Sequence, residues 1–155
     1  PRSTPKPSSA ASDVYKRQGR GLSATVAKEG ALKLMELAYI PCLAYPAGEM
    51  KHGPIALLEE GSPVVIIAPN DHLKEKTISA LHEVKARGAK VILIHEKGDS
   101  IASEGDVSIA VPSIHPWLTP LLTVLPLQLM AYETALRLGR DVDRPRNLAK
   151  SVPDE

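Results

Sequence analysis

The chain has 155 residues, of which 43% are hydrophobic and 24% charged. This is enough for one domain whose core buries roughly two-thirds of the unfolded surface. Its 19 basic and 18 acidic residues give a net charge of +1, so no long-range field favours nucleic acid or an anionic membrane. The single cysteine, Cys42, excludes an intrachain disulfide and a zinc site built from paired cysteines. A single cysteine also suits a reducing compartment, so we expect a cytoplasmic protein. No apolar run approaches the ~20 residues of a membrane-spanning helix.

The first 18 residues are rich in Pro and Ser and poor in large apolar side chains. Such a segment buries too little surface to offset the entropy lost on ordering. We therefore expect a disordered tail over residues 1–18, foreign to the domain that follows, and one domain over residues 19–155.

A helical pattern begins after a Gly-Arg-Gly turn at 19–21 and runs to about Tyr39. Its predicted buried stripe consists of Ala27, Ala31, Leu34, Met35 and Ala38. Pro41 ends the helix, and the following stretch 43–54, rich in Pro and Gly, predicts an irregular loop. Loops of this length often carry function.

Three β-branched runs, at 64–68, 91–94 and 107–111, predict buried strands of a parallel sheet. A helical pattern that ends at Gly88 lies between the first two runs. The last helix is expected over about 117–138, with a kink at Pro126. Its inward residues are predicted to be Leu121, Leu122, Leu125, Leu129 and Tyr132. The fold class is therefore α/β, with a mainly parallel sheet flanked by helices.

Six stretches carry a resemblance to a known family. In chain order they are KEGALKLMEL (28–37), YPAGEMKHGPIAL (45–57), PVVIIAPN (63–70), VKARGAKVI (84–92), VLPLQLMAYETAL (124–136) and DVDRPRNLAKSV (141–152). Together they resemble the isomerase domain of the glucosamine-6-phosphate synthase family, which contains two flavodoxin-like sugar-isomerase (SIS) subdomains. The resemblance covers residues 19 to about 152 and implies the second SIS subdomain.

The resemblance also implies a function for the chain within a larger enzyme. The family converts fructose 6-phosphate to glucosamine 6-phosphate with ammonia derived from glutamine. It has an N-terminal glutaminase domain and a first SIS subdomain whose Ser- and Thr-rich loops hold the sugar phosphate. We expect the chain to lack both, and therefore to show negligible turnover alone.

Three side chains of the first helix are candidates for the chemistry. Glu29, Lys33 and Glu36 are spaced by four and then three residues, so they share one helix face. Spacing alone favours an ion pair beside a solvated glutamate. The resemblance implies instead that Glu36 is the base that moves a proton between C1 and C2 of the sugar. It implies that Lys33 holds an oxyanion or tunes Glu36, while Glu29 is structural or contacts the substrate.

Two further candidates lie outside this helix. His52 precedes Gly53-Pro54 and on its own favours a surface turn. The resemblance implies a ring-opening acid/base that serves the neighbouring subunit, hence a homodimer. Lys150 on its own belongs to a basic tail, whereas the resemblance implies a carbonyl partner that forms an imine with C2 of the sugar. Ala149 beside it is predicted to contact the substrate.

The other histidines, His72, His82, His95 and His115, show no ligand-like spacing. We assign them to the surface or the core and predict no metal site and no cofactor. Two other functions stay open. One is a stand-alone SIS isomerase or deglycase that uses the same carboxylate. The other is a non-catalytic SIS module that binds a sugar phosphate as a regulatory signal, although the sequence shows no helix-turn-helix to accompany it.

Overall fold

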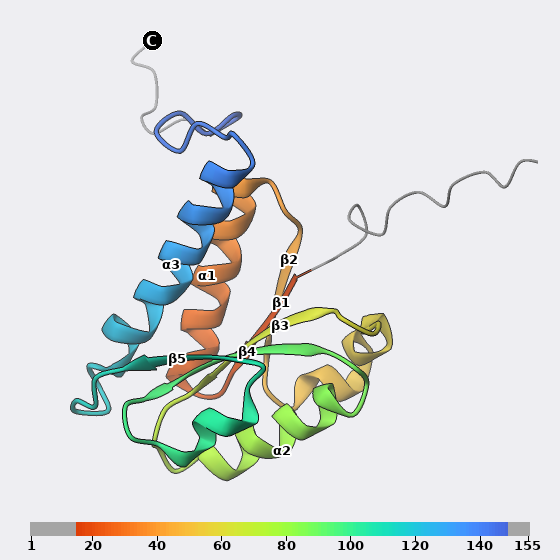
Figure 1. The fold of residues 1–155 in the computed structure, drawn as a ribbon, viewed down its shortest axis with the longest axis vertical. Helices are drawn as coiled ribbons and strands as arrows, with labels where there is room; N and C mark the ends of the chain where they lie inside the picture. The colour runs from red at the N-terminus through yellow and green to blue at the C-terminus, as the bar shows by residue number, and fades with distance from the viewer. Residues whose placement is uncertain (1–14, 149–155) are drawn as a thin grey trace, which may run out of the picture.

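The computed structural model describes residues 15–148, which form a parallel sheet between two helical layers (Figure 1). The strands are β1 (Tyr15–Gly19), β2 (Cys42–Pro46), β3 (Pro63–Ala68), β4 (Lys90–Glu96) and β5 (Val107–Val111). Their spatial order is β2-β1-β3-β4-β5, and all neighbours are parallel. The predicted α/β class with a parallel sheet is confirmed.

Helices cover both faces of this sheet (Figure 1). The helices α1 (Leu22–Ala38) and α3 (Thr119–Arg137) share one face, and α2 (Lys74–Lys85) covers the other. Three short 3-10 helices, η2 (Glu49–His52), η3 (Pro54–Leu57) and η4 (Ser100–Glu104), complete the described chain. None of the helices within residues 15–148 combines the length and the apolar character that crossing a bilayer requires.

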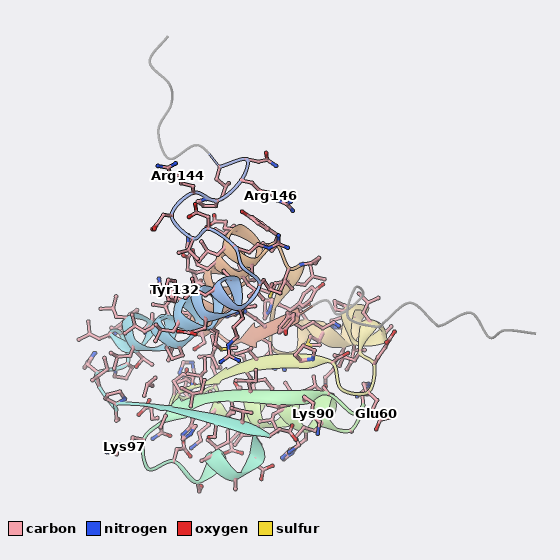
Figure 2. All side chains as sticks on the ribbon, turned by 45° about the horizontal axis from the view of Figure 1, so that its top comes forward. Glu60, Lys90, Lys97, Tyr132, Arg144 and Arg146 are labelled. Atoms are coloured by element: carbon pink, nitrogen blue, oxygen red, sulfur yellow. The ribbon has the colours of Figure 1, made fainter. Side chains whose placement is uncertain are left out.

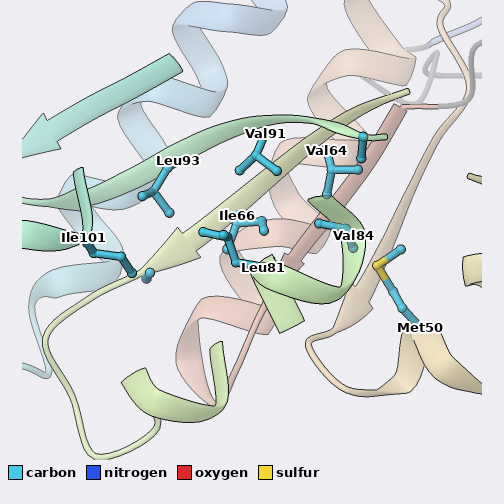
Figure 3. Close-up of a cluster of buried hydrophobic side chains, with 10 residues drawn as sticks. Met50, Val64, Ile66, Leu81, Val84, Val91, Leu93 and Ile101 are labelled. Atoms are coloured by element: carbon cyan, nitrogen blue, oxygen red, sulfur yellow. The ribbon is translucent and has the colours of Figure 1, made fainter. Parts of the chain in front are cut away.

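The core is built from the alternating side chains of β3 and β4. Val64 and Ile66 point to one face and pack with Leu81 of α2 (Figure 3). Val65 and Ile67 point to the other face and pack against α1 and α3. Each such buried side chain contributes roughly 1.5–3 kcal/mol of hydrophobic stabilisation. The continuous β-branched run is therefore explained by a central strand covered on both faces.

The disordered tail predicted over residues 1–18 is wrong at its C-terminal end. Tyr15–Gly19 forms β1, an interior strand that lies between β2 and β3. The rest of the predicted tail, residues 1–14, lies outside the described residues. The side chains of this segment have no preference for a strand, so composition does not indicate one. Backbone pairing with two neighbouring strands nevertheless stabilises it as a strand.

The irregular loop predicted over residues 43–54 is also wrong in part. Its first residues belong to β2, an edge strand, and the rest includes η2 and the start of η3. A short edge strand has mixed burial and therefore no continuous apolar run to reveal it.

The last helix is confirmed at nearly the predicted position, but its predicted inward face is wrong. The residues that face the sheet and α1 are Thr119, Thr123, Leu127, Ala131 and Ala135. By contrast, Leu121, Leu125, Leu129 and Tyr132 are exposed, and Leu122 is half-buried. Close packing against α1 favours small side chains on the inner face of α3. Because the outer face is apolar as well, the hydrophobic pattern does not show which face is buried.

Candidate active site

An ion cluster occupies the outer surface of α1. The Nζ atom of Lys33 lies 2.8 Å from Oε2 of Glu36 and 3.6 Å from Oε1 of Glu29. The helical spacing of these three residues therefore brings them together, as the sequence predicts. The hydrogen bond to Glu36 is the main reason why the pKa of Lys33 is raised above its ordinary value, so this amine is a full positive charge at neutral pH.

The geometry of Glu36 is suited to proton transfer. Its side chain is 25% exposed, so a ligand can reach it from outside the domain. Lys33 donates to Oε2, and among the described residues no other group bonds to this carboxylate. The oxygen Oε1 is therefore open to exchange a proton with a substrate, while Lys33 fixes the orientation of the carboxylate.

His52 lies in a different part of the molecule. It ends η2 and is exposed, between Gly48 (φ 112°) and Gly53 (φ 141°), whose conformations favour glycine. Met50 of the same turn packs into the core on the α2 face of the sheet. The structure therefore does not bring His52 to Glu36 within one chain.

The segment after α3 is held at the C-terminal end of α1. Tyr39, the residue after α1, has a φ of 59°. Its ring stacks 4.1 Å below the guanidinium of Arg146 and 5.1 Å from that of Arg140. The backbone N–H of Arg146 also donates to the Tyr39 hydroxyl at 2.9 Å. Arg146 projects beyond the helix ends in Figure 2.

Tyr39 follows Glu36 by three residues, which is about one helical turn. Its contact with Arg146 therefore holds the segment after α3 close to Glu36. Lys150 and Ala149, the predicted carbonyl partner and its neighbour, lie outside the described residues. Sequence reasoning missed Tyr39. No spacing rule marks it, because its partners lie more than 100 residues further along the chain.

A crevice of about 720 Å³ lies at the carboxyl ends of the strands. Its walls come from the segments after β1, β3, β4 and β5, and they include Gly21, Leu22, Ser23, Asn70, Asp71, Glu96, Ser113 and Trp117. The chain order reverses between β1 and β3, the position at which open α/β sheets bind ligands.

The chemistry of this crevice does not suit a phosphate. Glu96 is almost fully buried and accepts hydrogen bonds from the Asn70 backbone N–H at 3.0 Å and the Ser113 hydroxyl at 2.6 Å. Asp71 adds a second carboxylate, and neither lysine nor arginine is among its described lining residues. A phosphate bound there would therefore have no lysine or arginine among the described lining residues to neutralise it.

The sequence analysis assigned the other histidines to the surface or the core, and the positions of His95 and His82 agree with that assignment. His95 is buried, with Nδ1 2.8 Å from the Glu96 carbonyl and Nε2 2.7 Å from the Ser108 hydroxyl. His82 is exposed beside Glu104. Within residues 15–148, no group of three or more His, Cys, Asp or Glu side chains is placed to hold a metal ion.

Comparison with known proteins decides the family. The SIS domain model matches residues 18–138, most of the chain. The chain belongs to the SIS family. The predicted resemblance is thereby confirmed.

The curated relatives of this SIS domain include glutamine–fructose-6-phosphate aminotransferases (isomerizing). The enzyme of Thermus thermophilus is 58% identical over 138 residues, and that of Brucella abortus is 51% identical over 139 residues. Each match covers 88% of this chain but 23% of the relative. The chain therefore corresponds to the SIS part of these homologues and spans about a quarter of their length.

Solved structures agree with this placement. The C-terminal domain of glucosamine-fructose-6-phosphate aminotransferase from Francisella tularensis superposes with a TM-score of 0.79 at 41% identity, covering 85% of this chain and 38% of that one. Tagatose-6-phosphate ketose/aldose isomerase from Escherichia coli superposes with a TM-score of 0.77 at 21% identity, covering 92% and 40%. The second likeness shows the fold alone.

Proposed function

We propose that this SIS domain is the proton-transfer half of the isomerase site in a cytoplasmic glutamine-dependent fructose-6-phosphate aminotransferase. The enzyme would make glucosamine 6-phosphate from fructose 6-phosphate and ammonia released from glutamine. The observation that carries the proposal is the Glu36–Lys33 pair on the outer surface of α1, in a chain 58% identical to the T. thermophilus enzyme.

In this proposal His52 opens the sugar ring, and Lys150 engages the C2 carbonyl of the open chain. Ammonia then occupies C2 as an imine, with water released. Glu36 removes a proton from C1 while the imine nitrogen takes up a proton, which gives an enolamine. Glu36 then returns its proton to C2 as the O1 hydroxyl gives up its own, so that the 2-amino aldose forms. Lys33 orients Glu36 and compensates negative charge that develops at O1.

The phosphate anchor is proposed to come from outside this domain. The acidic crevice supports this, because its described lining offers no cation for a phosphate. The coverage of the relatives leaves room for a first SIS subdomain and a glutaminase domain. A homodimer is proposed because His52 is exposed on the face opposite to α1 and would act on the neighbouring subunit.

The experiment uses a hybrid enzyme, in which this chain replaces the matching region of the T. thermophilus relative. We expect the isolated chain to form no glucosamine 6-phosphate and the hybrid to form it. Glu36→Gln should lower kcat of the hybrid by about 10²–10⁴, the usual worth of a general base. Glu75→Gln, the same exchange at an exposed position of α2 on the other face of the sheet, serves as the matched control. Robust turnover by the isolated chain would contradict the proposal.

Two alternatives are distinguished by simple observations. A stand-alone SIS isomerase or deglycase would lack a Met-Cys-Gly start in the gene region that precedes this domain, whereas an amidotransferase would have it. A sugar-phosphate sensor would bind its ligand unchanged after Glu36→Gln and would show no turnover to lose. The proximity of Lys33 to Glu36 favours the enzyme, because a sensor needs no oriented base.

A further inference from the structure

Tyr39 has an uncommon backbone conformation at the end of α1. Its φ of 59° and ψ of 32° lie in the left-handed region, where glycine is the usual residue at a helix C-terminus. A tyrosine strains the backbone at this position, and local strain of this kind is typically retained where a side chain serves function. The contacts of the Tyr39 side chain therefore indicate what it does.

The side chain of Tyr39 contacts the segment that follows α3. The centroid of its ring lies 4.1 Å from the guanidinium carbon of Arg146 and 5.1 Å from that of Arg140, distances at which an aromatic face attracts a cation. The Tyr39 hydroxyl also accepts a hydrogen bond of 2.9 Å from the Arg146 backbone N–H. Tyr39 therefore holds both the side chain and the backbone of Arg146.

Other contacts order the chain between α3 and Arg146. Oδ1 of Asp141 accepts hydrogen bonds of 3.0 and 3.1 Å from the backbone N–H groups two and three residues further on, which forms a turn. Val142 packs against the apolar cluster that joins α1, β2 and α3. Arg146 comes four residues after Val142, so its contact with Tyr39 extends this anchorage towards the C-terminus.

The anchor lies next to the proposed proton-transfer carboxylate. Tyr39 follows Glu36 by three residues, which is about one helical turn. Lys150, the proposed carbonyl partner, follows Arg146 by four residues, and four residues span at most about 14 Å. A fixed Arg146 would therefore keep Lys150 near Glu36, whereas an unanchored segment would let the amine spread through a larger volume and lower its effective concentration.

We propose that Tyr39 is a positioning residue of the isomerase site, which fixes the segment 140–146 so that Lys150 meets the sugar carbonyl beside Glu36. This role rests on the proposed function and adds a residue that acts through another. A reactive group that is held in place before the substrate arrives loses less entropy in the reaction step. The strained backbone of Tyr39 is compensated by this fixed geometry.

The imine at Lys150 reports this role directly. In the hybrid enzyme, the Lys150 amine and the C2 carbonyl of fructose 6-phosphate would form an imine with loss of water. Sodium cyanoborohydride reduces the protonated imine by delivering hydride to C2, which leaves a stable secondary amine. Mass spectrometry quantifies the labelled Lys150 peptide, and Lys150→Ala is the blank. Labelling needs neither ammonia nor proton transfer by Glu36.

Two exchanges at Tyr39 separate the ring from the hydroxyl. Tyr39→Leu removes the ring and the hydrogen bond, so the labelling of Lys150 and kcat should each fall by about 10–100-fold, as for a misplaced reacting group. Tyr39→Phe keeps the ring and should stay within about 5-fold of the parent hybrid in both. KM for fructose 6-phosphate should change by less than about 3-fold, because the phosphate anchor is proposed to lie outside this domain.

Arg146 provides a second route to the same loss. Arg146→Gln removes the cation from the ring and should lower labelling by about 10-fold. Combined with Tyr39→Leu it should lower labelling no further, as for two residues that act through one contact. Arg144→Gln is the matched control and should have no effect, because Arg144 points to the other side of the segment in Figure 2.

Thermal unfolding of each hybrid accompanies the labelling. Labelling is compared well below every unfolding midpoint, so that a smaller folded fraction cannot account for a loss. If Tyr39→Leu does not fold, Arg146→Gln and Tyr39→Phe carry the comparison.

The outcomes separate this role from the proposed function. Full labelling of Lys150 in the folded Tyr39→Leu or Arg146→Gln hybrid would overturn the positioning role, and the function would stand if glucosamine 6-phosphate still forms. A parent hybrid without labelling at Lys150 would overturn the role as well. Labelling that depends on Tyr39 in a hybrid without turnover would support the role and refute the function.

Discussion

Arg17 places a cation in the buried interior of the sheet. It lies on the interior strand β1 with 0% of its surface exposed, and its three guanidinium nitrogens have no hydrogen-bond partner among the described residues. Burial lowers its pKa, and the nearby Cys42 compensates only in part. An uncompensated buried cation costs several kcal/mol. This burial could not be predicted from the sequence, because a Lys-Arg-Gln run indicates a solvated segment.

We therefore predict that Arg17→Met stabilises the protein. The free energy of unfolding should rise by about 2 kcal/mol, because an apolar side chain fills the same volume without a buried charge. Urea denaturation measures the change. Arg87→Met is the control, since Arg87 is exposed on the surface and should change stability by less than about 0.5 kcal/mol. A lower stability for Arg17→Met would show that the guanidinium has a partner.

Asp99 is a well-placed carboxylate by contrast. It caps η4 by accepting a hydrogen bond from the Ile101 N–H at 3.1 Å. The Nζ atom of Lys74 donates to Oδ1 at 2.8 Å and lies 2.7 Å from Oδ2. Burial by itself raises the pKa of Asp99, but Lys74 and the Ile101 N–H outweigh it, so the pKa is lowered below its ordinary value.

This lowered pKa predicts a pH dependence of stability. The unfolded state binds the proton more readily than the folded state, so the contribution of Asp99 is complete above about pH 5 and is lost as pH falls through its unfolded pKa of ~3.9 towards the folded one. Asp99→Asn should therefore cost about 1–2 kcal/mol at pH 7 and progressively less below pH 4. Urea titrations at several pH values measure this. An equal cost at pH 3 and pH 7 would contradict it.

At the scale of elements, α1 and α3 approach closely at Gly30. A Cβ atom placed there would lie 2.5 Å from Cδ1 of Leu127 and 2.6 Å from Nη1 of Arg17. The absence of a side chain therefore permits the contact between the two helices, and it accounts for a glycine in the middle of α1, where helix propensity disfavours it.

Gly30→Ala should destabilise the protein despite a gain of about 1 kcal/mol in helix propensity. Overpacking typically costs 1–3 kcal/mol, and here both neighbours must move, so we expect a net loss of about 1 kcal/mol. Chemical denaturation measures it. Thr25→Ala, on the exposed side of the same helix, isolates the propensity gain and should be neutral or stabilising. Gly30→Ala at least as stable as the parent chain would rule out the close contact.

The sequence located α3 but not its orientation. Its boundaries follow from the apolar pattern and Gly139, and they agree with Thr119–Arg137. The inner face depends on the distance to α1, which Gly30 sets from about 100 residues away, so a local pattern cannot reveal it. The bulky residues predicted to be buried are those that point outward.

At the scale of the whole molecule, the fold class and the family could be predicted because six motifs in family order and three β-branched runs are independent signals. The site could be predicted only in part. Glu29, Lys33 and Glu36 converge because they share one helix. His52 and Glu36 do not converge within one chain, and no sequence pattern shows which groups from other domains or subunits complete a site.

The central claim is that Glu36 and His52 act in one site formed by two subunits. Subunit complementation in the hybrid enzyme tests it most directly. Glu36→Gln and His52→Ala hybrids are each expected to be nearly inactive. Coexpressed with different tags, they should recover about a quarter of the parent activity, because half of randomly paired dimers hold one intact site of two. Activity no higher than the sum of the two single variants would contradict the account.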